Sequence, residues 1–174
     1  MSAPRLSVIL PVFNARAFVG AAIDSILAQT LDHFVFHIVD DGSTDGSGDL
    51  LAAKAARDSR IHLIRQENQG IVSSLNRMLA LVDTPFVARM DADDIAMPDR
   101  FARQIERMEA DAGLGALGTQ FEEIDEAGRR ISGGAAMPVG SALVRAELEQ
   151  RQPIANPTAM FRTRLPPPPI ILLA

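Results

Sequence analysis

The sequence predicts an α/β sandwich, in which helices cover both faces of a mostly parallel sheet. Short apolar segments with β-branched residues alternate four times with longer segments whose apolar residues repeat at helical spacing. The short segments are apolar throughout, as strands are when both faces of their sheet are covered. Polar residues follow three of them, and the carboxyl ends of parallel strands are where such sheets bind ligands.

The first half of this alternation contains two strands and two helices. A continuous apolar run predicts a strand over 6–12, and the spacing of the next apolar residues predicts a helix over 16–29. A second apolar run predicts a strand over 34–39, which ends at an Asp-Asp-Gly-Ser turn. The segment 47–57 is the second predicted helix.

The second half repeats the pattern. A short strand is predicted over 61–64, and a helix with one apolar face is predicted over 70–82. A fourth strand over 85–90 ends at an Asp-Ala-Asp-Asp sequence. The helix predicted over 98–112 begins at Pro98, because proline is favoured in the first turn of a helix.

The alternation stops after Gly113. Strands are predicted over 118–124 and 130–132, on either side of an Asp-Glu-Ala-Gly turn, and a helix is predicted over 139–150. The sequence therefore predicts that this part of the chain adds a hairpin and a helix to the sandwich.

The length of 174 residues suits one domain. Four consecutive prolines at 166–169 exclude a helix or a central strand there, so we expect one domain over 1–165 and a Pro-rich tail over 166–174. Hydrophobic residues make up 47% of the chain and charged residues 22%, which excludes disorder as a description of the whole. The chain has no cysteine, which excludes a disulfide scaffold.

Charge and aromatic content argue against a nucleic-acid partner. The net charge is -5, and the chain has neither Trp nor Tyr for stacking on bases. No apolar stretch approaches the ~20 residues of a membrane span, so no transmembrane segment is expected. The apolar run over 6–12 is too short for an export signal and contains Pro11. We therefore expect a cytoplasmic location.

Acidic and amide side chains follow three of the predicted strands. Asn14 follows the first, Asp40 and Asp41 end the second, and Asp91 and Asp93 follow the fourth. Carboxylates that meet at one edge of a sheet repel one another unless a cation neutralises them. A hard divalent ion bound by oxygen ligands and a phosphate is the usual solution. Asp91 and Asp93 would face the same side if the strand continued through them.

Four segments carry a resemblance in this order and spacing: Ser-Val-Ile-Leu-Pro-Val-Phe-Asn at 7–14, Val-Asp-Asp-Gly-Ser-Thr-Asp-Gly-Ser at 39–47, Glu-Asn-Gln-Gly at 67–70, and Met-Asp-Ala-Asp-Asp at 90–94 with Pro-Asp-Arg-Phe at 98–101. Together they resemble family-2 glycosyltransferases of the GT-A fold, over roughly residues 5 to 165. The resemblance implies a Rossmann-like sandwich that binds a nucleotide-sugar, most often a UDP-sugar, with Mn²⁺ or Mg²⁺.

The resemblance also assigns site residues. Asp91 and Asp93 match the Asp-x-Asp metal motif, with Asp93 as the direct ligand and Asp91 toward the ribose and the metal. Asp40 or Asp41 would accept a hydrogen bond from the nucleobase, and Asp41 is slightly favoured. Arg89 is expected either to contact a phosphate or to pair with Asp91. The full set implied to bind the nucleotide is Pro11, Val12, Phe13, Asn14, Asp40, Asp41, Asn68, Gly70, Arg89, Asp91 and Ala92.

The chemistry implied is an inverting transfer. An acceptor hydroxyl, on a saccharide or a lipid-linked molecule, attacks the anomeric carbon with the help of a carboxylate base. The resemblance further implies a role in cell-surface polysaccharide synthesis, in the cytoplasm or at the inner face of the membrane, by a chain that could form a homodimer.

Two departures from the family pattern stand out. Asn156 takes the place of a histidine that is common in the family, and the segment that supplies the catalytic base has no counterpart. The sequence therefore predicts a truncated transferase, and a non-catalytic nucleotide-sugar-binding module is the alternative. Glu122, Glu123 and Asp125 are the nearest substitutes for the missing base.

Overall fold

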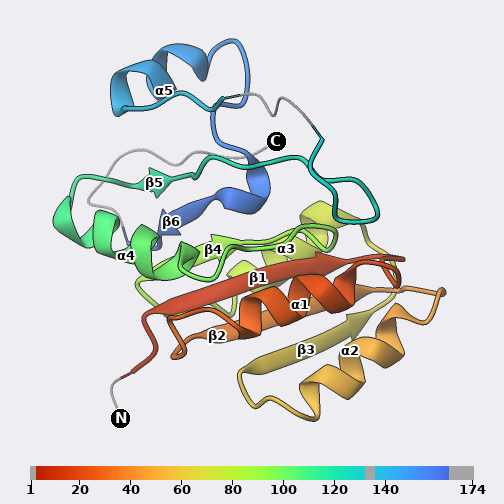
Figure 1. The fold of residues 1–174 in the computed structure, drawn as a ribbon. Helices are drawn as coiled ribbons and strands as arrows, with labels where there is room; N and C mark the ends of the chain where they lie inside the picture. Colours follow the sequence, from red (N-terminus) through yellow and green to blue (C-terminus); the bar gives the residue numbers. More distant parts are fainter. Residues whose placement is uncertain (1–2, 132–135, 165–174) are drawn as a thin grey trace.

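The computed structural model of the protein describes residues 3–131 and 136–164. Six strands form one sheet: β1 (Leu6–Val12), β2 (Val35–Asp41), β3 (Ile61–Gln66), β4 (Phe86–Arg89), β5 (Ala116–Leu117) and β6 (Met160–Arg162). Their order is β3-β2-β1-β4-β6-β5. The first four are parallel, whereas β6 runs antiparallel to both β4 and β5. The predicted α/β sandwich with a mostly parallel sheet is confirmed (Figure 1).

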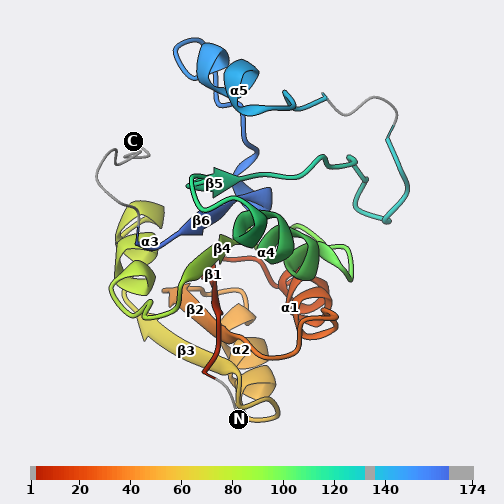
Figure 2. The ribbon, with the colours of Figure 1, turned by 90° about the vertical axis from the view of Figure 1, so that its left-hand side faces the viewer.

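Helices cover both faces of the sheet. α1 (Val19–Leu27), α2 (Ser47–Ala55) and α4 (Arg100–Ala110) lie on one face, and α3 (Ile71–Leu79) lies on the other, as the end-on view in Figure 2 shows. α5 (Ser141–Glu147) lies beyond β5 and buries none of its residues. No helix among the described residues is long and apolar enough to cross a membrane.

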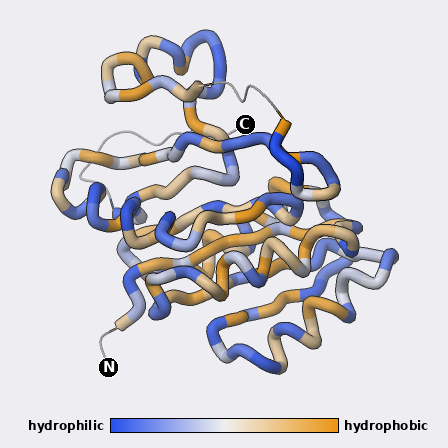
Figure 3. The backbone as a smooth tube through the Cα atoms, in the orientation of Figure 1, coloured by the Kyte–Doolittle hydropathy of each residue, from blue (hydrophilic) through white to orange (hydrophobic). Residues whose placement is uncertain are grey.

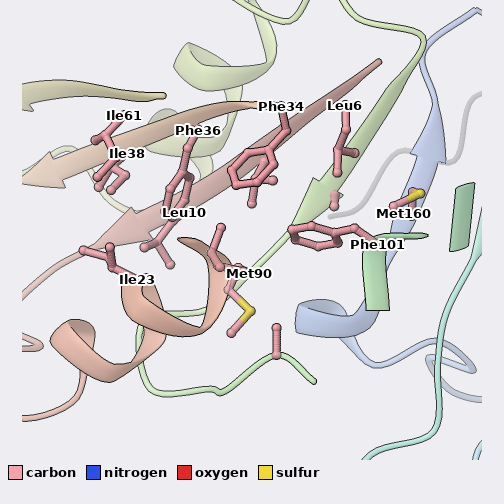
Figure 4. Packing of buried hydrophobic residues seen from close by; sticks show 14 of the residues in the cluster. Leu6, Leu10, Ile23, Phe34, Phe36, Ile38, Ile61, Met90, Phe101 and Met160 are labelled. Carbon is pink, nitrogen blue, oxygen red and sulfur yellow. The ribbon is translucent and has the colours of Figure 1, made fainter. Parts of the chain in front are cut away.

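The core lies mainly between the sheet and the α1, α2 and α4 layer. Figure 4 shows Ile23 of α1 and Phe101 of α4 on the same side of the sheet as Phe34 and Phe36. The rings of Phe34 and Phe101 meet edge to face with their centroids 6.0 Å apart. Burying a side chain of this size contributes about 1.5–3 kcal/mol. Figure 3 accordingly shows the central strands coloured largely toward the hydrophobic end of the scale.

A smaller cluster holds α3 on the opposite face. Met78 of α3 packs against Ile9, Val39 and Val87, which come from three neighbouring strands. Because consecutive side chains of a strand point to opposite faces, each central strand contributes to both clusters. This explains why the parallel strands are apolar throughout.

β1 lies between β2 and β4, so the order of the strands reverses beside it. At such a reversal the crossover helices lie on opposite faces, and a crevice opens at the carboxyl ends of the strands. The carboxyl ends of β1 and β2 lie side by side at this edge, because Val12 is paired with Asp40. The loops after β1, β2 and β4 therefore meet at one place.

The alternation of elements up to α4 is as predicted, but the helices are shorter. α1 begins at Val19 rather than at residue 16, and α4 begins at Arg100 rather than at Pro98. Asp99 occupies the position before the first turn of α4, so the prediction that Pro98 begins this helix is wrong. α5 likewise covers only the middle of the predicted helix over 139–150.

The predicted strand over 118–124 is wrong. The strand is β5, at Ala116–Leu117, where it pairs with Phe161 and Met160 of β6. A short 3-10 helix, Asn156–Thr158, precedes β6 and presents no strand edge to residues beyond Leu117. Of the strand predicted over 130–132, a single bridge between Ile124 and Arg130 is present, and residue 132 lies outside the described residues. The predicted tail over 166–174 also lies outside them.

Candidate functional site

The loops that follow β1 and β2 are tied together by hydrogen bonds. The N–H of Asn14 donates to Oγ of Ser43 at 3.0 Å, and the N–H of Thr44 donates to Oδ1 of Asn14 at 2.8 Å. Asn14 has a positive φ of 49°, a conformation that asparagine tolerates better than most residues. The N–H of Arg16 donates to Oδ2 of Asp45 at 2.9 Å. The Asn14 side chain therefore fixes the shape of the crevice wall.

Asp41 ends β2 on the α3 side and organises the loop that precedes α3. Its Oδ1 accepts hydrogen bonds from Nε2 of Gln66 at 2.7 Å and from the N–H of Gln69 at 2.9 Å. Its Oδ2 accepts one from the N–H of Gly70 at 2.8 Å. Burial raises the pKa of Asp41, but these hydrogen bonds outweigh the effect of burial and hold the pKa below its usual range. Asp41 is therefore an ionised, acceptor-only group.

Asp40 faces the opposite side of the sheet and packs under the start of α2. Its Oδ1 accepts a hydrogen bond from the N–H of Ser43 at 3.1 Å, and Nε of Arg65 lies 4.0 Å from its Oδ2. A Cβ atom at Gly48 would lie 2.5 Å from the same oxygen, so only glycine fits there. Asp40 is thus a support beneath the loop, separated from the crevice by the alternation of the strand.

The crevice is a cavity of about 700 Å³ at the carboxyl ends of β1, β2 and β4. Its lining includes ten of the twelve residues that the sequence pointed to: Pro11, Val12, Phe13, Asn14, Asp41, Asn68, Gly70, Asp91, Ala92 and Asp93. Asp40 and Arg89 do not line it.

Four further residues complete the lining: Ala15, Phe18, Ile71 and Ser74. Phe18 and Ile71 belong to the apolar residues at helical spacing in the predicted helices over 16–29 and 70–82, yet they are 38% and 54% exposed. Periodicity identifies the apolar face of a helix, but it does not show which end of that face extends past the core into a crevice.

The acidic residues after β4 lie on a turn. β4 ends at Arg89, so the strand does not continue through Asp91 and Asp93, but the turn that follows brings both residues to the cavity. Nε of Arg89 donates to Oδ1 of Asp91 at 3.0 Å. Burial and the charges of Asp93 and Asp91 raise the pKa of Asp94 to about 6, although Arg100 opposes this. The turn thus carries an excess of negative charge.

This donor set fits a divalent cation only in combination with a ligand. The described residues hold no group of three or more His, Cys, Asp or Glu side chains that could bind a metal ion alone. Asp91 and Asp93 supply carboxylate oxygens on one side of the cavity. One or two carboxylates completed by substrate phosphates and water is the usual arrangement for Mg²⁺.

A second, larger hollow of about 1650 Å³ lies on the α3 side of Arg89. Four arginines line it (Arg89, Arg107, Arg145 and Arg162), together with apolar side chains such as Leu75 and Leu79 of α3, and no carboxylate among the described residues does. Glu122, Glu123 and Asp125 line neither hollow.

Comparison with known sequences identifies relatives of this chain. The sequence profile of the family described as "Glycosyl transferase family 2" matches residues 7–165. A chondroitin synthase of Escherichia coli is 30% identical over 138 residues, which are 79% of this chain and 20% of that protein. A putative teichuronic acid biosynthesis glycosyltransferase of Bacillus subtilis, TuaG, is 38% identical over 106 residues, 60% of this chain and 42% of the relative.

Solved structures show the same fold. The mannosyltransferase PcManGT from Pyrobaculum calidifontis, in complex with GDP-Man and Mn²⁺, is 27% identical with a TM-score of 0.60 over 68% of this chain and 36% of its own. S. aureus TarS in complex with UDP-GlcNAc is 19% identical with a TM-score of 0.70 over 91% of this chain and 45% of its own. The chain thus spans less than half the length of these relatives. Because the family profile covers nearly the whole described chain, this protein belongs to glycosyl transferase family 2.

Proposed function

We propose that the chain binds a nucleotide-diphosphate sugar in the cavity at the ends of β1, β2 and β4, for metal-dependent, inverting transfer of the sugar to an acceptor hydroxyl. The observation that carries this proposal is the meeting of Asp41, Asp91 and Asp93 around one cavity of about 700 Å³. Family membership supports glycosyl transfer as the reaction class.

The hydrogen bonds of Asp41 favour a uracil base over guanine. Oδ1 already accepts two hydrogen bonds and Oδ2 accepts one, so the free acceptor capacity is on Oδ2. Uracil offers a single N–H on its pairing edge, whereas guanine offers two adjacent donors that need both oxygens. Phe13, Phe18 and Ile71 supply apolar surface for the base in the same cavity.

Asp93 and Asp91 would hold Mn²⁺ or Mg²⁺ at the diphosphate. A divalent ion there neutralises the phosphates and stabilises the charge that develops on the leaving group. Arg89 contacts Asp91 from the side of the second hollow, so its charge aligns that carboxylate. This favours the pairing role expected for Arg89 over direct phosphate contact.

We further propose that the acceptor enters from the second hollow. Its apolar lining and four arginines suit an anionic, lipid-linked saccharide better than a neutral one. The names of the relatives, a chondroitin synthase and a teichuronic acid enzyme, support a polysaccharide product. Asp41, Asp91 and Asp93 have other tasks in this proposal, so the catalytic base is expected to be a different carboxylate.

Calorimetry with UDP and GDP, each with Mn²⁺ or with EDTA, tests the binding part. Mn²⁺-dependent binding of UDP in preference to GDP is expected, because a polar site rejects a ligand that leaves its buried groups unpaired. Equal affinities for the two nucleotides, or an affinity for UDP that EDTA does not change, would contradict the proposal. Transfer is tested by incubating the protein with radiolabelled UDP-sugars and a lipid-linked acceptor and measuring the label in the product.

A further inference from the structure

Arg100 is a buried charge directly beneath the acidic turn. It is the first residue of α4 and is only 8% exposed. Its Nη2 donates to the carbonyl oxygen of Arg89 at 3.0 Å, and its Nη1 lies 3.5 Å from Sδ of Met90. Arg89 and Met90 are the two residues that precede Asp91. The planar guanidinium therefore joins the start of α4 to the end of β4.

Gln104, one turn further along α4, holds this guanidinium in place. Its Oε1 accepts a hydrogen bond from Nε of Arg100 at 3.0 Å. Its Nε2 donates to the carbonyl oxygens of Thr158 at 2.8 Å and Leu117 at 3.2 Å. Gln104 is 2% exposed, so both ends of its amide group are used in a dry environment. The Arg100 side chain is consequently held in one orientation.

Burying an arginine side chain costs free energy, because its charged guanidinium loses its hydration. The three polar contacts of the guanidinium are all to uncharged groups, so no ion pair among the described residues offsets the loss of hydration. A leucine or methionine would pack between α4 and β4 without this penalty. Burial lowers the pKa of Arg100 to about 10, although the negative charges of Asp94 and Asp91 oppose this. The position of the charge thus points to the acidic turn.

We propose that Arg100, anchored by Gln104, is a positioning residue that holds the end of β4 so that Asp91 and Asp93 face the cavity together. The inference rests on the proposed function, since it assumes that these two carboxylates bind the metal. Arg100 itself reaches neither ligand nor metal in this proposal, because it lines neither hollow.

Arg100→Lys tests the geometry without removing the charge, because an ammonium cannot reach Arg89 and Gln104 with the same fork. We expect the affinity for Mn²⁺ in the presence of UDP to fall about 10-fold or more, as when other supports of metal ligands are removed. The free-Mn²⁺ signal in electron paramagnetic resonance measures this affinity without turnover. Binding of UDP in EDTA should not change.

Arg60→Lys is the matched control. Arg60 also donates a fork of hydrogen bonds, to Asp58 and to the carbonyl oxygens of Leu27 and Asp32. It precedes β3, at the opposite end of the sheet from the cavity. We expect this variant to lower Tm without changing the affinity for Mn²⁺, which separates loss of stability from loss of positioning.

Two substitutions of Gln104 separate its hydrogen bond with Arg100 from its hydrogen bonds to Thr158 and Leu117. Gln104→Glu keeps an acceptor for Nε of Arg100 but loses the donor to Thr158 and Leu117. Gln104→Met loses both. We expect Gln104→Glu to keep the affinity for Mn²⁺ at a lower Tm, and Gln104→Met to lose affinity as Arg100→Lys does.

These outcomes distinguish two failures. If the unaltered chain does not bind Mn²⁺ with UDP, the proposed function is wrong and this inference with it. If the unaltered chain binds and Arg100→Lys binds equally well, only the positioning role is wrong. Equal loss in Gln104→Glu and Gln104→Met would also overturn it. The Gln104 pair decides the question if Arg100→Lys does not fold.

Discussion

Replacing Asp41 by Asn should damage both the fold and the nucleotide site. The carboxylate accepts three hydrogen bonds, two at Oδ1 and one at Oδ2. Asparagine keeps one acceptor oxygen, so its amide N–H₂ must face the N–H of either Gly70 or the pair from Gln66 and Gln69. Losing one bond to a charged acceptor and leaving a buried donor unpaired should lower the free energy of unfolding by about 2–4 kcal/mol.

Urea denaturation followed by circular dichroism measures this loss, and calorimetry with UDP and Mn²⁺ measures binding. Each kcal/mol should lower Tm by about 2–4 °C in a chain of this size. UDP affinity should fall about 10-fold or more, because the acceptor for the base is lost and the loop before α3 loosens. Metal dependence of the remaining binding should persist.

Asp40→Asn is the control, since Asp40 is equally buried and adjacent in sequence. Its single strong partner is the N–H of Ser43, which the amide oxygen of asparagine can still accept. We expect a loss of about 1 kcal/mol or less and unchanged UDP affinity. The reasoning is refuted if the two variants weaken UDP binding equally, or if Asp41→Asn is as stable as the unaltered chain.

Three further outcomes are expected. Asp93→Asn should abolish Mn²⁺-dependent UDP binding in calorimetry, and Asp91→Asn should weaken it less; binding unchanged by Asp93→Asn would exclude this metal site. His37 is buried against His62 with ring centroids 5.5 Å apart, and burial and His62 lower its pKa although Asp83 opposes this. The folded chain thus favours the neutral ring, so the free energy of unfolding should fall as pH drops below about 6.5, and His37→Leu should flatten this dependence in urea titrations. Phe101→Ala should lower the free energy of unfolding by about 3–5 kcal/mol, because it empties a fully buried site, and a loss under about 1 kcal/mol would show that the site collapses.

The family-defining part of the fold could be predicted from local patterns. The alternation of apolar runs and helical spacing identified β1 to β4 and α1 to α4, because each central strand is buried on both faces and each helix on one. The acidic turn after β4 and the loop after β2 were recognisable because turn chemistry is encoded in a few consecutive residues.

Long-range pairing decided the rest. β5 and β6 are two and three residues long and lie 43 positions apart (117 to 160), so no local periodicity marks them and their register depends on the partner strand. The same holds for His37 and His62, which become neighbours only through the register of β2 and β3.

In the site, the sequence by itself determined which residues could meet, and the tertiary structure decided which ones do. Asp40 and Asp41 are adjacent in the sequence, and the resemblance favoured Asp41 only slightly, but the alternation of β2 directs Asp41 to the cavity and Asp40 beneath α2. Arg100 is one more residue of an amphipathic helix until α4 docks under the end of β4 and buries its charge against the Arg89 carbonyl. The physical reason is that burial and hydrogen bonding depend on packing between elements, whereas a sequence pattern records only the periodicity within each one.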